Sequence, residues 1–198
     1  VLDNYNKSVS MGAELVVFPE LILSGYPPQD LLLRKRFLAE AADALDEIAK
    51  HSSVPIILGN AFVENNELFN CSFLCEKGKI LGFYKKILLP TYDVFDEARY
   101  FDADDRPGIA RTINGSFELG VTVCEDAWQV SGETPSEYNA DPIEQLAEWG
   151  RQGVQLDATV NLSASPYHAE KIQTRLRVAR TAAECLNHPF LLANQVGG

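Results

Sequence analysis

The stretch FELGVTVCEDAW, residues 117–128, decides how this chain is expected to fold. Its first part is short, apolar and rich in β-branched residues, which is the pattern of a buried strand. The strand ends at Cys124, so a thiol stands where a strand meets a loop. Two further apolar runs, LVVFP at residues 15–19 and PFLLANQV at residues 189–196, predict other buried strands.

Amphipathic helices alternate with these strands. The first is expected to begin at Asp30, a good N-cap residue, and to run to about Lys50 with one apolar face. The second begins at Asp141, where an N-cap, Pro142 at the first helical position and the carboxylate of Glu144 combine. Both helices are expected to pack against a sheet.

A third helix is predicted over residues 169–186, and further strands over residues 55–63, 68–86 and 154–162, with a turn at residues 76–79. The apolar stripe expected on the third helix is Ile172, Leu176, Ala179, Ala183 and Leu186. Strands that alternate with helices, plus one hairpin, indicate an α/β protein with a mixed sheet covered by helices.

Composition limits the possible partners. The length of 198 residues and the hydrophobic content of 46% fit one globular domain, residues 1–198. With 17 basic and 28 acidic residues, the net charge of -11 repels phosphate backbones and anionic membranes, so neither nucleic acid nor membrane is an expected partner. The four cysteines lack the paired spacing of a zinc site, so we expect no metal and a reducing cytoplasm.

Three residues with complementary chemistry follow short strands: Glu20 after LVVFP, Lys86 in FYKKILLP, and Cys124 after LGVTV. Residues at strand ends on a shared sheet edge can converge in space. A thiol needs a base or a nearby cation to react as thiolate, and an ammonium can stabilise the oxyanion formed when an amide is attacked. Together these residues predict a covalent acyl-transfer site.

Each of the three also has a simpler structural explanation when taken alone. Glu20 fits a helix cap or surface carboxylate, Lys86 fits a solvated charge at a sheet edge, and Cys124 fits ordinary core packing. The other cysteines sit inside apolar strand or helix patterns and are expected to be core residues: Cys71, Cys75 and Cys185.

The segments VVFPEL, YKKILLP and VTVCEDAW resemble, in order and spacing, the three signature segments of the nitrilase superfamily, whose members use a Glu, Lys, Cys triad. The resemblance implies a four-layer α-β-β-α sandwich with mixed sheets. It also selects Lys86 over Lys85, because the family places one residue between its tyrosine, here Tyr84, and the catalytic lysine.

Four more segments, LSGYPPQDLLL, LPTYDVFDEARYF, NLSASPYH and ANQVGG, are similar to the glutaminase domain of glutamine-dependent NAD synthetases over nearly the whole chain. The resemblance implies hydrolysis of L-glutamine to glutamate and ammonia without a cofactor. The ammonia would pass to a separate C-terminal synthetase domain that uses ATP and Mg²⁺ to amidate deamido-NAD.

The same resemblance implies roles for residues around the triad. Glu97 would be a supporting active-site glutamate that orients Lys86 and the thiol. The expected glutamine contacts are Tyr92, Ser165 and Lys171, with the ammonium of Lys171 on the substrate α-carboxylate. Three aromatic residues either wall the pocket or belong to the ordinary aromatic core: Tyr26, Phe95 and Trp128.

The chain departs from the family pattern at both ends. The AQ.NP-type strand that normally precedes LVVFP and the SGG loop of the synthetase domain are missing from the 198 residues, so we expect a truncated glutaminase domain that pairs with itself, as nitrilase-type domains usually do. Two alternatives remain open. One is a stand-alone amidase or carbamoylase, and the other is an inactive domain that only associates with a partner.

The segment QVSGETPSEYNADP, residues 129–142, is polar, rich in turn-forming residues and long for a connection. Loops of this kind are often functional lids, and a plain surface excursion is the alternative interpretation.

Overall fold

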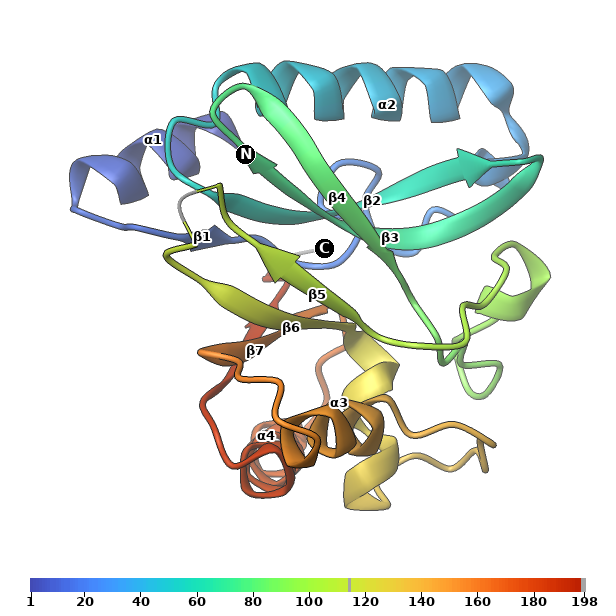
Figure 1. Ribbon diagram of the computed structural model, residues 1–198. Coiled ribbons are helices and arrows are strands. Elements are labelled where there is room, and N and C mark those ends of the chain that lie inside the picture. The colour runs from blue at the N-terminus through green and yellow to red at the C-terminus, as the bar shows by residue number, and fades with distance from the viewer. Residues whose placement is uncertain (114, 197–198) are drawn as a thin grey trace.

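The computed structural model describes residues 1–113 and 115–196, so Gly197 and Gly198 of the ANQVGG segment lie outside the described residues. Two sheets lie face to face between two layers of helices (Figure 1). Helices α1 (Leu2–Ser10) and α2 (Lys35–Lys50) cover the first sheet, and α3 (Pro142–Arg151) and α4 (Lys171–Leu186) cover the second. The predicted four-layer α-β-β-α sandwich is confirmed.

The first sheet contains four strands in the order β1-β2-β3-β4. The β1–β2 pair is parallel, and the β2–β3 and β3–β4 pairs are antiparallel. The turn between β3 and β4 falls at residues 77–78, as predicted. The bounds of these strands are Val16–Val17, Ile56–Glu64, Glu67–Glu76 and Lys79–Lys85.

The second sheet has the order β5-β6-β7-β8, with an antiparallel β5–β6 pair followed by two parallel pairs. Both sheets are therefore mixed. The strand bounds are Gly108–Arg111, Glu118–Val123, Ala158–Ser163 and Phe190–Asn194. Short 3-10 turns occupy several of the connections: η1 (Gln29–Leu33), η2 (Glu97–Arg99), η3 (Cys124–Ala127) and η4 (Gln129–Ser131).

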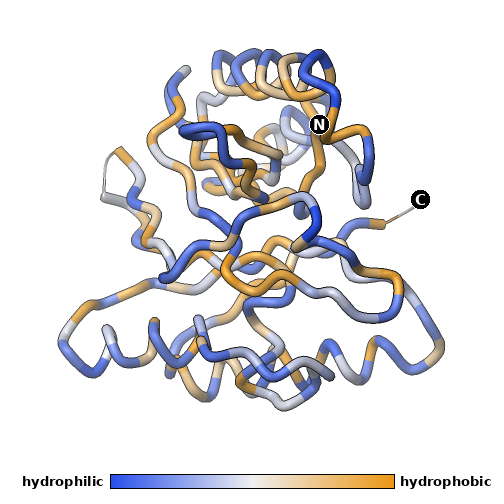
Figure 2. The backbone as a smooth tube through the Cα atoms, turned by 90° about the vertical axis from the view of Figure 1, so that its right-hand side faces the viewer, coloured by the Kyte–Doolittle hydropathy of each residue, from blue (hydrophilic) through white to orange (hydrophobic). Residues whose placement is uncertain are grey.

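The alternation of side chains along the strands creates separate apolar layers. In β2, Ile56 and Leu58 face the helices α1 and α2, whereas Ile57 faces the other sheet. Figure 2 shows the hydrophobic stretches gathered in the central strands, with hydrophilic residues frequent along the outer helices. The buried residues between the two sheets are Ile57, Leu74, Ala110, Leu119, Val121, Ala158, Val160 and Leu162.

Of the two helix starts predicted from an aspartate N-cap, one is correct and the other is wrong. Asp141 caps α3, and its carboxylate accepts hydrogen bonds from the backbone N–H groups of Ile143 and Glu144. Asp30, however, is not the N-cap of α2: it lies in η1, and α2 begins after Arg34, whose backbone is extended. The chain bends there because Leu32 is buried in the core beneath it, and the Asp30 carboxylate instead accepts a hydrogen bond from Tyr100.

The predicted apolar stripe of α4 is also largely wrong. Ile172 and Leu176 are 57% and 48% exposed. The residues of α4 that pack against α3 are Val178, Ala182 and Leu186. Only the second half of the helix rests on this apolar layer, because the first half extends beside a cavity described below.

Within residues 1–113 and 115–196, none of the helices has the length and apolar character needed to cross a bilayer.

Gly59 of β2 lies where the strand passes directly under the turn at Glu20. A Cβ atom at this position would overlap the backbone nitrogen of Leu21 and lie 2.7 Å from the Glu20 Cα. Only glycine permits this approach, because backbone atoms cannot move aside as the end of a flexible side chain can. Gly59 therefore sets the depth at which the Glu20 backbone sits against the first sheet.

We predict that Gly59→Ala lowers the free energy of unfolding by about 1–3 kcal/mol, the usual cost of overpacking a core. Urea unfolding followed by circular dichroism measures the change. Gly150→Ala in α3 is the matched control: a Cβ there meets nothing within 4 Å, so a gain of up to about 1 kcal/mol is expected. Equal stability of the two variants would contradict the assignment of Gly59.

Candidate active site

A buried ammonium shared by two carboxylates forms the centre of the site. Lys86 directly follows β4, and its Nζ lies 2.8 Å from Glu20 Oε1 and 2.8 Å from Glu97 Oε1. All three residues are buried. Burial lowers the pKa of Lys86, but the neighbouring carboxylates outweigh it and hold that pKa well above its ordinary value. The lysine is therefore charged.

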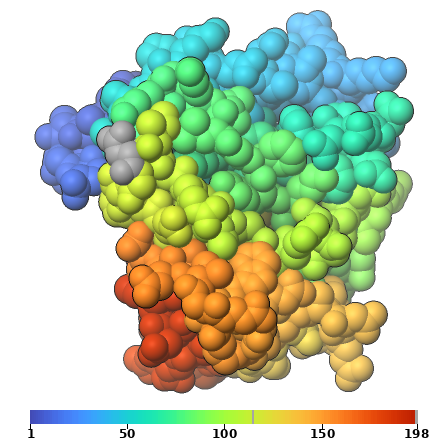
Figure 3. All heavy atoms as spheres, in the orientation of Figure 1, coloured from blue at the N-terminus to red at the C-terminus, as the bar shows by residue number. Residues whose placement is uncertain are grey.

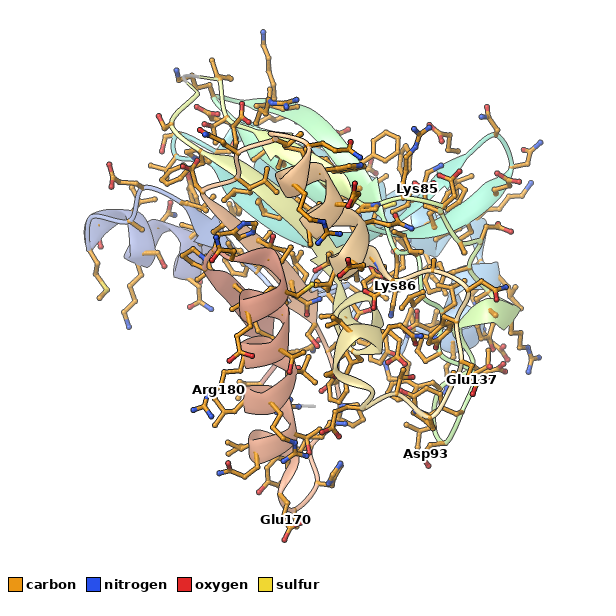
Figure 4. The ribbon with its side chains drawn as sticks, turned by 60° about the horizontal axis from the view of Figure 1, so that its bottom comes forward. Lys85, Lys86, Asp93, Glu137, Glu170 and Arg180 are labelled. Carbon is orange, nitrogen blue, oxygen red and sulfur yellow. The ribbon has the colours of Figure 1, made fainter. Side chains whose placement is uncertain are left out.

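Lys85 occupies a different environment, although it is adjacent in sequence. Its Nζ pairs with Glu64 at 2.8 Å and lies 3.6 Å from the centre of the Phe69 ring. Successive residues of an extended chain point to opposite faces, so only one of the two lysines can reach the space between the sheets. Figure 4 shows Lys86 in the middle of the molecule. The two adjacent lysines therefore occupy separate environments.

The Glu20 carboxylate is held by donors from both sheets. Its Oε1 accepts a second hydrogen bond from Asn70 Nδ2 of β3 at 2.8 Å, and its Oε2 accepts from the backbone N–H of Ala164 at 2.9 Å. Ala164 directly follows β7. The carboxylate thus lies at the junction of the two sheets, with a fixed orientation.

Glu97 lies in η2 and contributes the second carboxylate. Its Oε1 accepts from Lys86 and also from the Tyr26 hydroxyl at 2.7 Å. Burial raises the pKa of Glu97, although Lys86 opposes this. Glu97 thus lies beside Lys86, and the Tyr26 hydroxyl donates to the same carboxylate oxygen.

Cys124 stands at the end of β6 as the first residue of η3. Its φ of 44° lies in the left-handed region, which is unfavourable for a residue with a side chain and is often found at functional positions. Ser163 Oγ is 3.4 Å from the sulfur. Burial and the Glu20 carboxylate raise the pKa of the Cys124 thiol, and Lys86 lowers it by less. The resting sulfur is thus a thiol whose main charged neighbours are Glu20 and Lys86.

Cys124 opens onto a cavity of about 290 Å³. Five of the residues predicted to contact or enclose a substrate line this cavity: Tyr92, Phe95, Trp128, Ser165 and Lys171. Tyr26 instead lines an adjoining cavity of about 660 Å³, to which Phe95 and Ser165 also contribute. The predicted substrate residues therefore line one or both of two neighbouring cavities, and the Tyr26 hydroxyl contacts Glu97.

Two basic residues of α4 lie in this region: Lys171 lines the Cys124 cavity, and Arg175 lines the adjoining one. Lys171 Nζ lies 4.3 Å from the centre of the Trp128 ring, and burial followed by the charge of Arg175 lowers its pKa. Arg175 donates to the hydroxyl and the backbone carbonyl of Ser165. Arg175 was not predicted from the sequence, where it is one of several basic residues on a helix surface.

Glu125 is the main site residue that the sequence analysis missed. It is buried, lines the Cys124 cavity and accepts hydrogen bonds from Tyr92, Thr134 and Tyr138. The only sequence feature that pointed to Glu125 was its position directly after Cys124, the candidate nucleophile. The contacts of Thr134 and Tyr138 tie the polar segment at residues 129–142 to the cavity wall, so this segment is part of the site.

The surface in Figure 3 shows the layers of the sandwich closely packed from the first sheet to α3. The loops around the cavity gather at one end of the molecule, where Figure 4 places Asp93 and Glu137. Asp93 lines the cavity, and Glu137 belongs to the segment tied to Glu125.

Curated relatives with similar sequences are named glutamine-dependent NAD(+) synthetases. The chain is 38% identical to the protein of Thermotoga maritima over 192 residues, which cover 94% of the chain and 30% of that protein. It is 35% identical to the protein of Aquifex aeolicus, covering all of the chain and 32% of that protein. The chain therefore spans about a third of the length of these relatives.

Solved structures give a consistent picture of the fold. A glutamine-dependent NAD+ synthetase from Acinetobacter baumannii superimposes with a TM-score of 0.85 at 28% identity, covering all of this chain and 34% of that chain. An amidase from Nesterenkonia sp. superimposes with a TM-score of 0.74 at 20% identity, covering 99% of this chain and 68% of that chain, a likeness that shows the fold alone.

A family model described as carbon-nitrogen hydrolase matches residues 1–198 in full. This match agrees with the sandwich fold, with the synthetase relatives and with a buried cysteine whose charged neighbours include an ammonium and a carboxylate. The chain belongs to the carbon-nitrogen hydrolase family.

Proposed function

We propose that this chain hydrolyses the side-chain amide of L-glutamine through a thioester at Cys124. The observation that carries the proposal is the pairing of a reactive end and a recognition end in one cavity. Cys124, whose charged neighbours include Glu20 and Lys86, lines the same cavity as the buried carboxylate of Glu125 and the ammonium of Lys171. A free amino acid requires both charges for its head group.

The first chemical step uses Glu20 as a general base. Because the pKa of the thiol is raised, Glu20 takes the Sγ proton as sulfur attacks the amide carbon. The oxyanion that forms is stabilised by the Lys86 ammonium and by the backbone N–H after the nucleophile. Glu20 then returns the proton to the departing nitrogen, so that ammonia leaves and the acyl group remains on sulfur.

The second step releases glutamate. Water enters the position vacated by ammonia, Glu20 takes its proton, and the hydroxide attacks the thioester carbon. Collapse of the second tetrahedral intermediate returns the electron pair to sulfur, which recovers its proton from Glu20. Glu97 acts throughout by holding Lys86 in place, supported by the hydroxyl of Tyr26.

Recognition of the amino acid depends on the charged and polar residues of the cavity wall. We assign the substrate α-carboxylate to Lys171, supported by Ser165, and the α-ammonium to Glu125, supported by Tyr92. Phe95 and Trp128 form apolar walls. A simple aliphatic amide would leave the buried Glu125 carboxylate without a cationic partner, which argues against an amidase specific for such substrates.

The wider role follows from the relatives. Since the similar proteins are named glutamine-dependent NAD(+) synthetases, we propose that the ammonia feeds a C-terminal synthetase domain that amidates deamido-NAD with ATP and Mg²⁺. The glutaminase step itself is proposed to need no cofactor. The four free cysteines suit a cytoplasmic, reducing environment. We also propose a homo-oligomer, as expected of nitrilase-type domains.

We predict that Cys124→Ala lowers the rate of ammonia release from glutamine by at least about 1,000-fold, because the covalent route is lost. Circular dichroism should show an intact fold. Cys185→Ala, the half-buried cysteine of α4, is the matched control and should keep its activity. Turnover of propionamide but not of glutamine by the unmodified chain would refute the glutaminase assignment, and an active Cys124→Ala variant would refute the thioester.

We predict that Lys171→Ala raises KM for glutamine by about 10- to 100-fold with little change in kcat, because a charged hydrogen bond to the substrate is lost. Steady-state ammonia release measures both constants. Arg180→Ala is the control on the same helix; Figure 4 shows its side chain pointing away from the body of the molecule. A lower kcat at unchanged KM would place Lys171 in the chemical step instead.

We predict that alkylation of Cys124 by iodoacetamide becomes steadily faster from pH 7 to pH 9. The raised pKa of the thiol means that the thiolate fraction is small at pH 7 and grows about tenfold per pH unit until the pKa is passed. Mass spectrometry of the Cys124 peptide gives the rate. A plateau below pH 8 would show a preformed thiolate and remove the need for Glu20 as the base.

A further inference from the structure

Asp126 is a buried carboxylate whose known partners are all backbone N–H groups. Its Oδ1 accepts from Ile87 at 3.1 Å and from Leu88 at 2.8 Å, and its Oδ2 accepts from Val123 at 2.8 Å. The residue lies in η3, two positions after Cys124. Within the described part of the chain, it is not among the residues that line the Cys124 cavity.

The three donors belong to the two segments that carry the reacting groups. Ile87 and Leu88 directly follow Lys86, and Val123 directly precedes Cys124. These segments leave β4 and β6, which belong to different sheets and are not joined by strand pairing. A single carboxylate therefore bridges the main chain beside the ammonium and the main chain beside the thiol.

We infer that Asp126 is a positioning residue that fixes the position of Lys86 relative to Cys124 across the junction of the two sheets. The inference rests on the function proposed above for those two residues. The bridge is rigid, because a carboxylate with three N–H donors has little freedom to rotate. A displacement of about 1 Å between reacting groups is enough to lower the rate about 100-fold, so the relative position of these two groups is critical.

The burial of Asp126 makes its ionised form costly, as expected if the carboxylate is needed as an acceptor for the three N–H groups. Burial raises its pKa to about 7, even though the N–H groups of Leu88, Val123 and Ile87 lower it. The ionised carboxylate is thus less stable in this position than in water. An apolar residue of similar size would avoid that cost, and it would leave three buried N–H groups without an acceptor.

Asp141 provides a matched comparison. Its carboxylate also accepts backbone hydrogen bonds, from Ile143 and Glu144 at 3.1 Å each, but these donors belong to the first turn of α3. Both aspartates stabilise the fold through N–H groups, and only Asp126 joins the segments of Lys86 and Cys124. A variant of Asp141 therefore reports the effect of lost stability alone.

The test is the rate at which iodoacetamide alkylates Cys124 in the full chain at fixed pH, read by mass spectrometry. The variants are Asp126→Ala, Asp126→Asn, Asp141→Asn, Lys86→Met and the double variant Lys86→Met with Asp126→Asn. If Asp126→Ala does not fold, Asp126→Asn carries the test, because it retains the oxygen that faces Ile87 and Leu88. Circular dichroism confirms which variants are folded.

We expect Asp126→Asn to slow alkylation by about 10- to 100-fold and Asp141→Asn to change it by less than about twofold. Since Asp126 acts through Lys86, the double variant should react as slowly as Lys86→Met alone. The inference would be overturned if the double variant reacted more slowly than Lys86→Met by the factor that Asp126→Asn shows alone. It would also be overturned if Asp126→Asn reacted as fast as the unmodified chain. Iodoacetamide requires no glutamine recognition, so failed glutamine turnover would refute the proposed function and leave this test valid.

Discussion

A single buried ammonium, Lys86, shared by the carboxylates of Glu20 and Glu97, is the interaction on which the rest of the structure depends. Loss of one partner from such a buried cluster costs about 3–5 kcal/mol. Hydrogen bonds from Asn70 to Glu20 and from Tyr26 to Glu97 further stabilise this cluster in the interior.

The two sheets of the sandwich are joined at this ionic centre. The Glu20 carboxylate takes hydrogen bonds from β3 and from the end of β7, so each sheet supplies a donor to the same group. Asp126 adds a second connection, between the segments that follow β4 and end β6. With the thiol kept protonated by burial, this centre has the composition that base-assisted attack on an amide requires.

Strand ends were the part of the site that local sequence patterns could predict. Glu20, Lys86 and Cys124 each follow a short apolar run, and parallel or neighbouring strand ends meet in space. Glu125 escaped notice because two of its hydroxyl donors, Thr134 and Tyr138, come from the segment at residues 129–142, which has no periodic pattern. The apolar face of α4 was misassigned for a related reason: periodicity does not reveal that half of a helix borders a cavity instead of a sheet.

The central claim is that one cavity holds the amide of glutamine against Cys124 and its head group between Glu125 and Lys171. A crystal structure of the chain after reaction with a glutamine analogue that carries an electrophilic ketone tests this directly. We expect a covalent bond to the Cys124 sulfur, with the ketone oxygen near Lys86 and the head group in the cavity of about 290 Å³. An adduct on another cysteine, or a head group in the adjoining cavity of about 660 Å³, would contradict it.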